Sequence, residues 1–223
     1  DQYLGDPALW EDAQKTIREL AAANELEFFE MAGEAAFYGP KIDFMATDAI
    51  GREHQVATIQ LDFVQPDRFK LEYTSEDGSA AQPVMVHCAL LGSVERFLSV
   101  YIEHVAGRFQ VWVAPEQIRL ITVNQEDVTV AFADKIVAQA KQLGLRISAD
   151  NTNESVGKKI RDAEVWKVPY TVVIGEKEIA SDRLMPRIRQ DMEVLAAHPE
   201  MNFGEFLQTV ANEAKNRTTK SSL

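Results

Sequence analysis

The chain contains one cysteine, Cys88, among its 223 residues, so it cannot form an internal disulfide. A single free cysteine favours a reducing compartment, and we expect the protein to be cytoplasmic. Long apolar runs are also lacking, since no stretch approaches the roughly 20 residues that a membrane helix needs. The opening residues have neither the basic start nor the apolar core of a signal peptide. We therefore expect no membrane partner.

Positive charge is in short supply, because 23 Lys and Arg residues stand against 35 Asp and Glu residues, for a net charge of -12. This balance argues against a polyanionic partner, which Lys and Arg would have to bind. The segment between Ser155 and Arg189 is an exception, with eight basic against five acidic side chains. Such a segment can dock a nucleic acid on one face, although a run of this size is also typical of an ordinary solvated surface.

The length allows one large or two ordinary domains, and a hydrophobic content of 46% is enough for a packed core. Before Pro115, the hydrophobic pattern predicts a helix, a run of antiparallel strands with turns at 39–40 and 49–51, a loop, a buried strand and a second helix. These predicted elements cover, in order, residues 7–24, 28–63, 65–82, 84–89 and 93–106.

Beyond Pro115, strands alternate with helices, which indicates a mixed sheet with helices packed on it. We expect five strands in this sheet, with a strand-like hairpin between residue 174 and Arg189. Residues 218–223 look disordered. The strands are predicted at 118–123, 146–149 and 170–174, and the helices at 128–143, 156–165 and 203–215.

Three blocks of sequence carry a resemblance to a known family. In this order they resemble the C-terminal half of a class II aminoacyl-tRNA synthetase active site, in the spelling of the threonyl family. The blocks are Ala36-Phe37-Tyr38-Gly39-Pro40-Lys41-Ile42-Asp43-Phe44, Gln55-Val56-Ala57-Thr58-Ile59-Gln60-Leu61-Asp62-Phe63 and His87-Cys88-Ala89-Leu90-Leu91-Gly92-Ser93-Val94-Glu95-Arg96-Phe97.

The second region carries a resemblance of its own. Three of its segments are similar to the anticodon-binding domain that threonyl, prolyl, histidyl and glycyl synthetases share. They are residues 153–161, 168–170 and 175–178. The implied fold class is α+β followed by α/β: part of the class II antiparallel domain over residues 1–115, then an α/β anticodon-binding domain over residues 116–223.

The resemblance implies ATP-dependent activation of threonine, with Mg²⁺, and transfer of threonine to its tRNA by a homodimeric enzyme. Arg96 matches the arginine that stacks on the adenine of ATP, a use that suits a planar and permanently charged group. Ser93, which we expect to cap the following helix, belongs by the same match to the substrate-binding residues. Without the resemblance, Arg96 is typical of an exposed helix arginine paired with Glu95 or Glu103.

His87 matches one of three zinc ligands in the family. Three protein ligands leave an open position on zinc, where the amine and hydroxyl of threonine bind together. The other histidines, His54, His104 and His198, show no metal-ligand spacing. Cys88, which stands where the family usually has arginine, is adjacent to His87 in a strand and should point to the opposite face. The alternative for His87 is a core histidine bonded to backbone.

Tyr38 and Lys41 flank a Gly-Pro turn and by resemblance line the threonine and adenylate pocket, with Lys41, Gln55 and Arg96 in catalytic roles. Gln55, which also belongs to the ATP site, and Gln60 are five residues apart, so a regular strand would place them on opposite faces. Both can face the site only if a bulge intervenes. The family commonly has Gly at Ala57, which would ease such a bulge. The alternative is an ordinary hairpin with a surface lysine.

Five residues match positions that the family uses to read the anticodon of single-stranded RNA, through contacts to base edges. They are Asn153, Arg161, Lys167, Glu178 and Arg187. Lys167 stands where arginine is frequent, and the two are not equivalent at a bidentate site. The alternative is that Glu178 and Arg187 merely pair across a hairpin.

The family's first motif, its second motif and two further zinc ligands should lie before Asp1. We therefore expect a C-terminal fragment that is inactive alone. A non-catalytic tRNA- or RNA-binding protein that keeps the synthetase C-terminus is the competing hypothesis. A prolyl or glycyl fragment fits the Tyr-Gly-Pro-Lys and Thr-Ile-Gln-Leu-Asp-Phe spellings less well.

Overall fold

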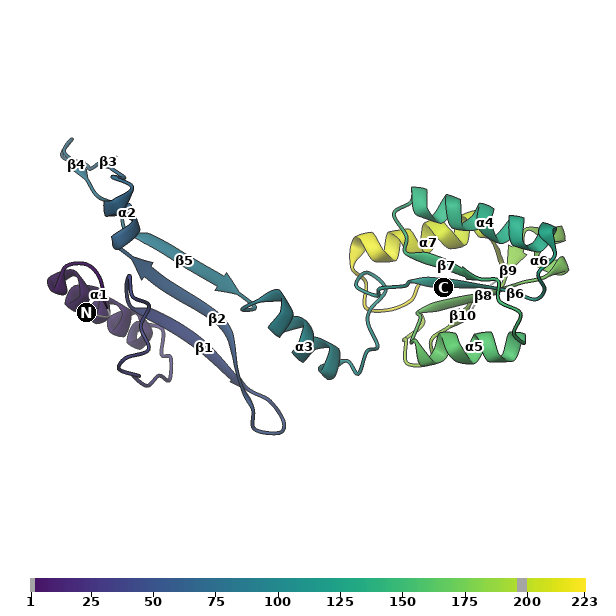
Figure 1. Cartoon of the computed structure of the whole chain (residues 1–223), viewed down its shortest axis with the longest axis horizontal. Helices are drawn as coiled ribbons and strands as arrows, with labels where there is room; N and C mark the ends of the chain where they lie inside the picture. The colour runs from purple at the N-terminus through teal and green to yellow at the C-terminus, as the bar shows by residue number, and fades with distance from the viewer. Residues whose placement is uncertain (1–2, 196–199) are drawn as a thin grey trace. The chain divides into compact units, whose positions relative to one another are not determined.

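The structure is a computed structural model that describes residues 3–195 and 200–223. It divides into two compact units, Asp1–Val100 and Tyr101–Leu223, which are called here the N-terminal and C-terminal units (Figure 1). Each is considered by itself. The division falls within a helix, and a domain boundary at residue 115 stays a prediction.

The N-terminal unit contains a three-stranded antiparallel sheet in the order β1-β2-β5. The predicted antiparallel strands are confirmed for residues 41–62, but residues 28–40 form no strand beyond an isolated bridge between Ala36 and Gly39. Glycines and Pro40, which has no N–H to donate, interrupt any ladder there. The elements are α1 (Pro7–Ala23), β1 (Lys41–Thr47), β2 (Glu53–Asp62), α2 (Val64–Arg68), β3 (Tyr73–Thr74), β4 (Ala80–Ala81), β5 (Met85–Leu90) and α3 (Val94–His104).

β5 was expected to be buried, and this expectation is wrong. Its residues alternate between half-buried and exposed, and the side chain of Leu90 is 77% exposed. The apolar run in the sequence predicts burial, but each residue of a strand faces one side of the sheet only. Among the described residues, the buried core cluster contains no residue of β5.

The turn before β1 is held against the neighbouring strand at Gly39. A Cβ added at Gly39 would lie 1.9 Å from the backbone oxygen of Leu61, closer than any real contact. The N–H of Leu61 also donates to the carbonyl of Pro40 at 3.0 Å. Glycine is therefore required for a close backbone approach, which fixes where Tyr38 and Lys41 stand on either side of the turn.

We expect Gly39→Ala to displace this turn from β2, because the clash is with backbone and no side chain can yield. The change should appear as large amide shifts for residues 36–39, 41–42 and 59–62 in a two-dimensional NMR spectrum. Gly157→Ala is the control, since a Cβ at Gly157 in the C-terminal unit meets nothing within 4 Å. Unchanged amide positions around Leu61 in Gly39→Ala would contradict the close approach.

The C-terminal unit contains a four-stranded mixed sheet in the order β10-β8-β6-β7, in which β6, β7 and β8 are parallel and β10 is antiparallel. Helices α4 and α7 lie on one side of the sheet and α5 on the other (Figure 1). The elements are β6 (Ile118–Thr122), α4 (Asp127–Gln142), β7 (Ile147–Asp150), α5 (Val156–Val165), β8 (Tyr170–Ile174), α6 (Glu176–Ser181), β9 (Arg183–Leu184), β10 (Arg187–Ile188), β11 (Met201–Asn202) and α7 (Phe203–Asn216).

The predicted alternation of strands and helices is confirmed here, with two corrections. The main sheet has four strands instead of five, because β9 pairs separately with β11. The segment after β8 is the helix α6, where a strand-like hairpin was expected. Glu178 accepts a hydrogen bond from the N–H of Gly175 at 3.0 Å, which caps that helix.

The chain end is ordered, whereas residues 218–223 were expected to be disordered. The Tyr170 hydroxyl lies 2.6 Å from Glu213 Oε2 and 2.7 Å from Ser221 Oγ, all within a buried network. Burial and the neighbouring Glu213 carboxylate raise the pKa of Tyr170. The side chain of Leu223 is buried in the same core. A short polar tail in the sequence gives no signal of such partners.

Lys159 is a large charged side chain in the mostly apolar interior of this unit, and it is only 1% exposed. Its Nζ donates to the carbonyl of Thr122 at 2.9 Å and to that of Asp150 at 3.1 Å. These carbonyls lie at the carboxyl ends of β6 and β7, where the ladder stops. The lysine therefore joins α5 to the sheet edge and satisfies groups that burial would otherwise leave unpaired.

We expect Lys159→Met to lower the free energy of unfolding by about 2 kcal/mol, because two buried carbonyls lose a charged donor while the stem is kept. Denaturant titration of the chain measures this. Lys158→Met is the matched control: the side chain of Lys158 is 52% exposed and pairs with surface carboxylates, so a much smaller change is expected. Equal effects at both positions would contradict the bridging role of Lys159.

Within the described residues, no helix is both long enough and apolar enough to span a membrane.

Candidate functional site

Three polar side chains stand in one row across the sheet of the N-terminal unit. Lys41 on β1 is opposite Gln60 on β2, and Gln60 is opposite His87 on β5. Residues that face one another across antiparallel strands share a face of the sheet. The register therefore brings together residues from all three sequence blocks, on a face that we call the polar face.

A bulge in β2 adds Gln55 to the polar face. Phe44 pairs with Ala57 and Met45 pairs with Gln55, so Val56 has no partner and the register shifts there. As a result, Gln55 Nε2 reaches Asp43 Oδ1 at 2.8 Å, on the same side as Lys41 and Gln60. The bulge that both glutamines require is present, and it forms with alanine at position 57.

Asp43 connects Lys41 and Gln55, to which catalytic roles were assigned. Lys41 Nζ donates to Asp43 Oδ2 at 2.5 Å, and the other oxygen accepts from Gln55. Lys41 is therefore a paired and half-buried lysine, not a free surface one. The sequence analysis overlooked Asp43, although its two-residue spacing from Lys41 on a predicted strand places both on one face.

Tyr38 closes the other end of the row. Its hydroxyl donates to Gln60 Oε1, and its ring centroid lies 5.4 Å from that of His87. The turn at Gly39 thus carries Tyr38 over the polar face beside both residues. Lys41, Gln60, Tyr38 and His87 form one connected group, to which Asp43 and Gln55 belong through Lys41.

Asp62, a second residue that the sequence analysis missed, lies next to His87. It is fully buried, and its Oδ2 is 2.8 Å from His87 Nε2. Burial alone would raise the pKa of Asp62, but hydrogen bonds from the Gln65 backbone, His87 and the Val64 backbone outweigh it, so the pKa is lowered. His87 is therefore bonded to a carboxylate, not to backbone as the alternative required.

The described residues include no cluster of three His, Cys, Asp or Glu side chains that could hold a metal ion. Cys88 is exposed and alternates with His87 along β5, so the two face opposite sides as expected. His198 lies outside the described residues. The zinc role of His87 stays a prediction, and the chain offers one ligand to it.

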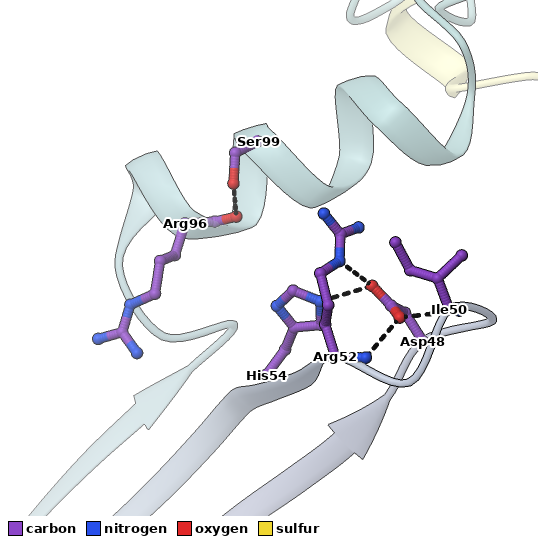
Figure 2. A network of polar contacts seen from close by, with 6 residues as sticks. All are labelled: Asp48, Ile50, Arg52, His54, Arg96 and Ser99. Atoms are coloured by element: carbon purple, nitrogen blue, oxygen red, sulfur yellow. Dashed lines mark hydrogen bonds and ion pairs between the residues drawn. The ribbon is translucent and has the colours of Figure 1, made fainter.

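Arg96 stands in the first turn of α3, which Ser93 caps: the N–H of Arg96 donates to Ser93 Oγ at 3.2 Å. Its side chain is exposed and extends away from the side chains of Asp48, Arg52 and His54 (Figure 2). The guanidinium has no hydrogen bond or ion pair among the described residues. The structure leaves it accessible to a ligand.

The five residues assigned to anticodon reading are spread over the C-terminal unit and lie on different elements. Asn153 and Glu178 follow β7 and β8, so they lie at the carboxyl edge of the parallel strands, while Lys167 and Arg187 lie at the opposite edge. Arg161 is exposed on α5 between the two edges. The residues form an extended strip and do not make a single compact site.

A cavity of about 600 Å³ opens at the second of these edges. Lys167 and Arg187 line it, together with Arg108 and Arg189, which the sequence analysis did not select. The four basic side chains are opposed by two acidic ones, Glu164 and Asp191. The cavity is therefore suited to an anionic ligand, although Arg189 already pairs with Asp191 at 2.6 Å.

Three of the five residues have partners within the protein. Lys167 Nζ donates to the carbonyl of Ala106 at 2.6 Å, and Glu178 Oε2 caps α6. The proposed hairpin pair of Glu178 with Arg187 is wrong, because Glu178 lies in a helix and the ion-pair partner of Arg187 is Glu164, at 3.9 Å. Asn153, Arg161 and Arg187 remain the most exposed of the set.

Comparison with known proteins gives two family matches. Residues 8–105 match the tRNA synthetase class II core domain (G, H, P, S and T), and residues 117–213 match the anticodon binding domain. Among solved structures, the RNA binding domain of threonyl-tRNA synthetase from Cryptosporidium parvum is 29% identical with a TM-score of 0.79, covering 100% of this chain and 54% of that chain.

The chain is also similar in sequence to curated proteins. The threonine–tRNA ligases of Gloeobacter violaceus and Synechocystis sp. are each 46% identical, over 86% and 95% of this chain. The matches cover 30% and 35% of those proteins, so the chain spans about a third of their length. The chain belongs to the class II tRNA synthetases, in which it represents part of the core domain followed by an anticodon-binding domain, with threonine–tRNA ligases as its relatives.

Proposed function

We propose that the chain is part of a threonine–tRNA ligase, with amino-acid activation on the polar face and anticodon recognition on the C-terminal unit. The observation that carries this proposal is the row of Lys41, Gln60 and His87 across three strands. A boundary near residue 115 separates the two functions. The single cysteine fits a cytoplasmic location.

The proposed reaction has two steps. The carboxylate of threonine attacks the α-phosphate of ATP, which forms the adenylate and releases pyrophosphate. The terminal ribose hydroxyl of the tRNA then takes the acyl group, and AMP leaves. Catalysis depends mainly on positioning and on stabilising charge at the phosphoryl centre, where class II synthetases use ATP with Mg²⁺.

The residues of this chain supply part of that positioning. Asp43 holds Lys41 and Gln55 side by side, so a cation and an amide donor are fixed on the polar face before any ligand arrives. Arg96, held in the first turn of α3, would stack on the adenine. Tyr38 and Gln60, which are bonded to each other, would border the threonine.

A zinc ion is implied by the family, and the donor chemistry of His87 fits one of its ligands. With Nε2 bonded to Asp62, Nδ1 is left for a metal. When bound, zinc would supply an open coordination position for the amine and hydroxyl of threonine. By the same resemblance, the complete enzyme would be a homodimer.

We expect a hybrid enzyme to show threonine-dependent exchange of pyrophosphate into ATP. In the hybrid, this chain replaces the matching segment of the Synechocystis sp. relative, of which it covers 35%. Lys41→Met should lower the exchange rate by about 100-fold, because a fixed cation near the reacting phosphate is lost.

Lys70→Met is the matched control for the hybrid. Lys70 is an exposed lysine of the same unit, away from the polar face, and its loss should leave the rate within about twofold. An inactive hybrid that still binds threonine tRNA, or equal losses in both variants, would count against catalysis on the polar face.

We expect the chain itself to bind threonine tRNA more tightly than a transcript that differs only in its anticodon. Arg187→Ala should weaken that binding by about tenfold and reduce the selectivity, because a contact to a base edge is lost. Fluorescence anisotropy at fixed moderate salt measures both. The matched control is Arg183→Ala. Arg183 is an exposed arginine on β9 that pairs with Glu200 and does not line the cavity, so its loss should leave the selectivity unchanged. Equal affinity for the two transcripts would contradict anticodon reading.

A non-catalytic RNA-binding protein is the second candidate. It is favoured by one observation: the hydrophobic core cluster of the described residues lies entirely in the C-terminal unit, which carries the anticodon-matching residues. Recognition therefore has a stably packed scaffold. Selective tRNA binding together with a catalytically inactive hybrid would support this candidate over the ligase.

A further inference from the structure

Asp62 occupies a special position at the end of β2. Its side chain is a carboxylate and yet fully buried, and its two oxygens have three hydrogen-bond partners. Oδ1 accepts from the N–H of Val64 and the N–H of Gln65, both at 2.9 Å. Oδ2 lies 2.8 Å from His87 Nε2. One oxygen thus caps α2, and the other faces the imidazole.

This arrangement determines where the proton of a neutral His87 resides. An ionised carboxylate can only accept hydrogen bonds, so Nε2 must carry the hydrogen that lies between them. Neutral imidazole has one N–H, and the remaining lone pair is then on Nδ1. The His87 side chain is 36% exposed, whereas that of Asp62 is fully buried, so the ring is the accessible member of the pair.

We propose that Asp62 is a positioning residue that holds His87 in the Nε2–H tautomer and presents Nδ1 as its ligand atom. The assignment of Nδ1 to zinc rests on the proposed function. The tautomer itself follows from the contacts of Asp62 alone. Carboxylate partners of this kind commonly orient metal-binding histidines and raise their basicity.

The test variant is Asp62→Asn, which keeps the shape of the side chain. The amide Nδ2 cannot accept a hydrogen bond, so Oδ1 must stay on the N–H groups of Val64 and Gln65. Nδ2 is then left facing His87, where it donates. His87 Nε2 becomes an acceptor, and the proton moves to Nδ1. The substitution should therefore reverse the tautomer while leaving the cap of α2 in place.

A second Asp–His pair in the same unit provides the matched control. Asp48 Oδ1 accepts from the N–H groups of Ile50 and Arg52, and its Oδ2 lies 3.0 Å from His54 Nε2 (Figure 2). The two backbone contacts and the imidazole contact repeat those of Asp62, in the turn between β1 and β2, and Asp48 Oδ2 also accepts from Arg52 Nε at 2.6 Å. Asp48→Asn should change the signals of His54 and leave those of His87 unchanged.

The measurement is a two-bond ¹H–¹⁵N correlation spectrum of the ¹⁵N-labelled chain at about pH 8.5, where imidazole is neutral. The chain has four histidines, and His87→Gln identifies the His87 signals by their loss. We expect Nε2–H in the unmodified chain and Nδ1–H in Asp62→Asn. An Nδ1–H tautomer in the unmodified chain would overturn the proposal without any variant. Retention of Nε2–H in a folded Asp62→Asn chain would overturn it as well.

The zinc part is tested separately in the hybrid ligase. There, Asp62→Asn should weaken zinc binding by about 10- to 100-fold in competition with a chelator. If the tautomer reverses in the chain but zinc affinity in the hybrid is unchanged, the zinc assignment of the proposed function fails and the positioning by Asp62 stands. If the tautomer test fails, the positioning by Asp62 fails, and the proposed function is left as it was.

Discussion

The register of the β1-β2-β5 sheet is the constraint on which the candidate site depends. It aligns Lys41, Gln60 and His87 across three strands, and the unpaired Val56 shifts it once so that Gln55 joins the same face. A slip of one residue would send each of these side chains to the opposite face. The turn at Gly39 and the cap provided by Asp62 both hold the C-terminal end of β2, and both depend on backbone contacts.

Carboxylates organise the polar face, and neither of the two that matter most is a reacting group in the proposed mechanism. Asp43 holds Lys41 and Gln55, and Asp62 holds His87. Fixed partners of this kind remove the need to reorganise side chains when a substrate binds, which is where enzymes gain most of their electrostatic stabilisation. Placing them on adjacent strands is more precise than placing them on loops.

The C-terminal unit is held together by contacts of a different kind. Its parallel strands end at a common edge, where Lys159 satisfies two carbonyls with a buried ammonium, and its chain end is held by Tyr170 and Glu213. A rigid α/β scaffold then carries Asn153, Arg161 and Arg187 as an extended strip of exposed residues from one edge of the sheet to the other. An extended strip suits single-stranded RNA, whose bases are contacted one after another. The basic cavity beside Lys167 and Arg187 lies at one end of this strip.

The sequence by itself determined the family resemblance, most helices and strands, and the candidate residues, because hydrophobic period and motif spelling are local properties. It also predicted that Gln55 and Gln60 require a bulge, since strand alternation is a local rule. Only the tertiary structure decided that the bulge forms at Val56, that Asp43 and Asp62 hold the site, and that Ser221 and Leu223 are buried. These outcomes depend on contacts between residues distant along the chain, such as Asp62 with His87 and Tyr170 with Ser221, whose free energy no local pattern reports.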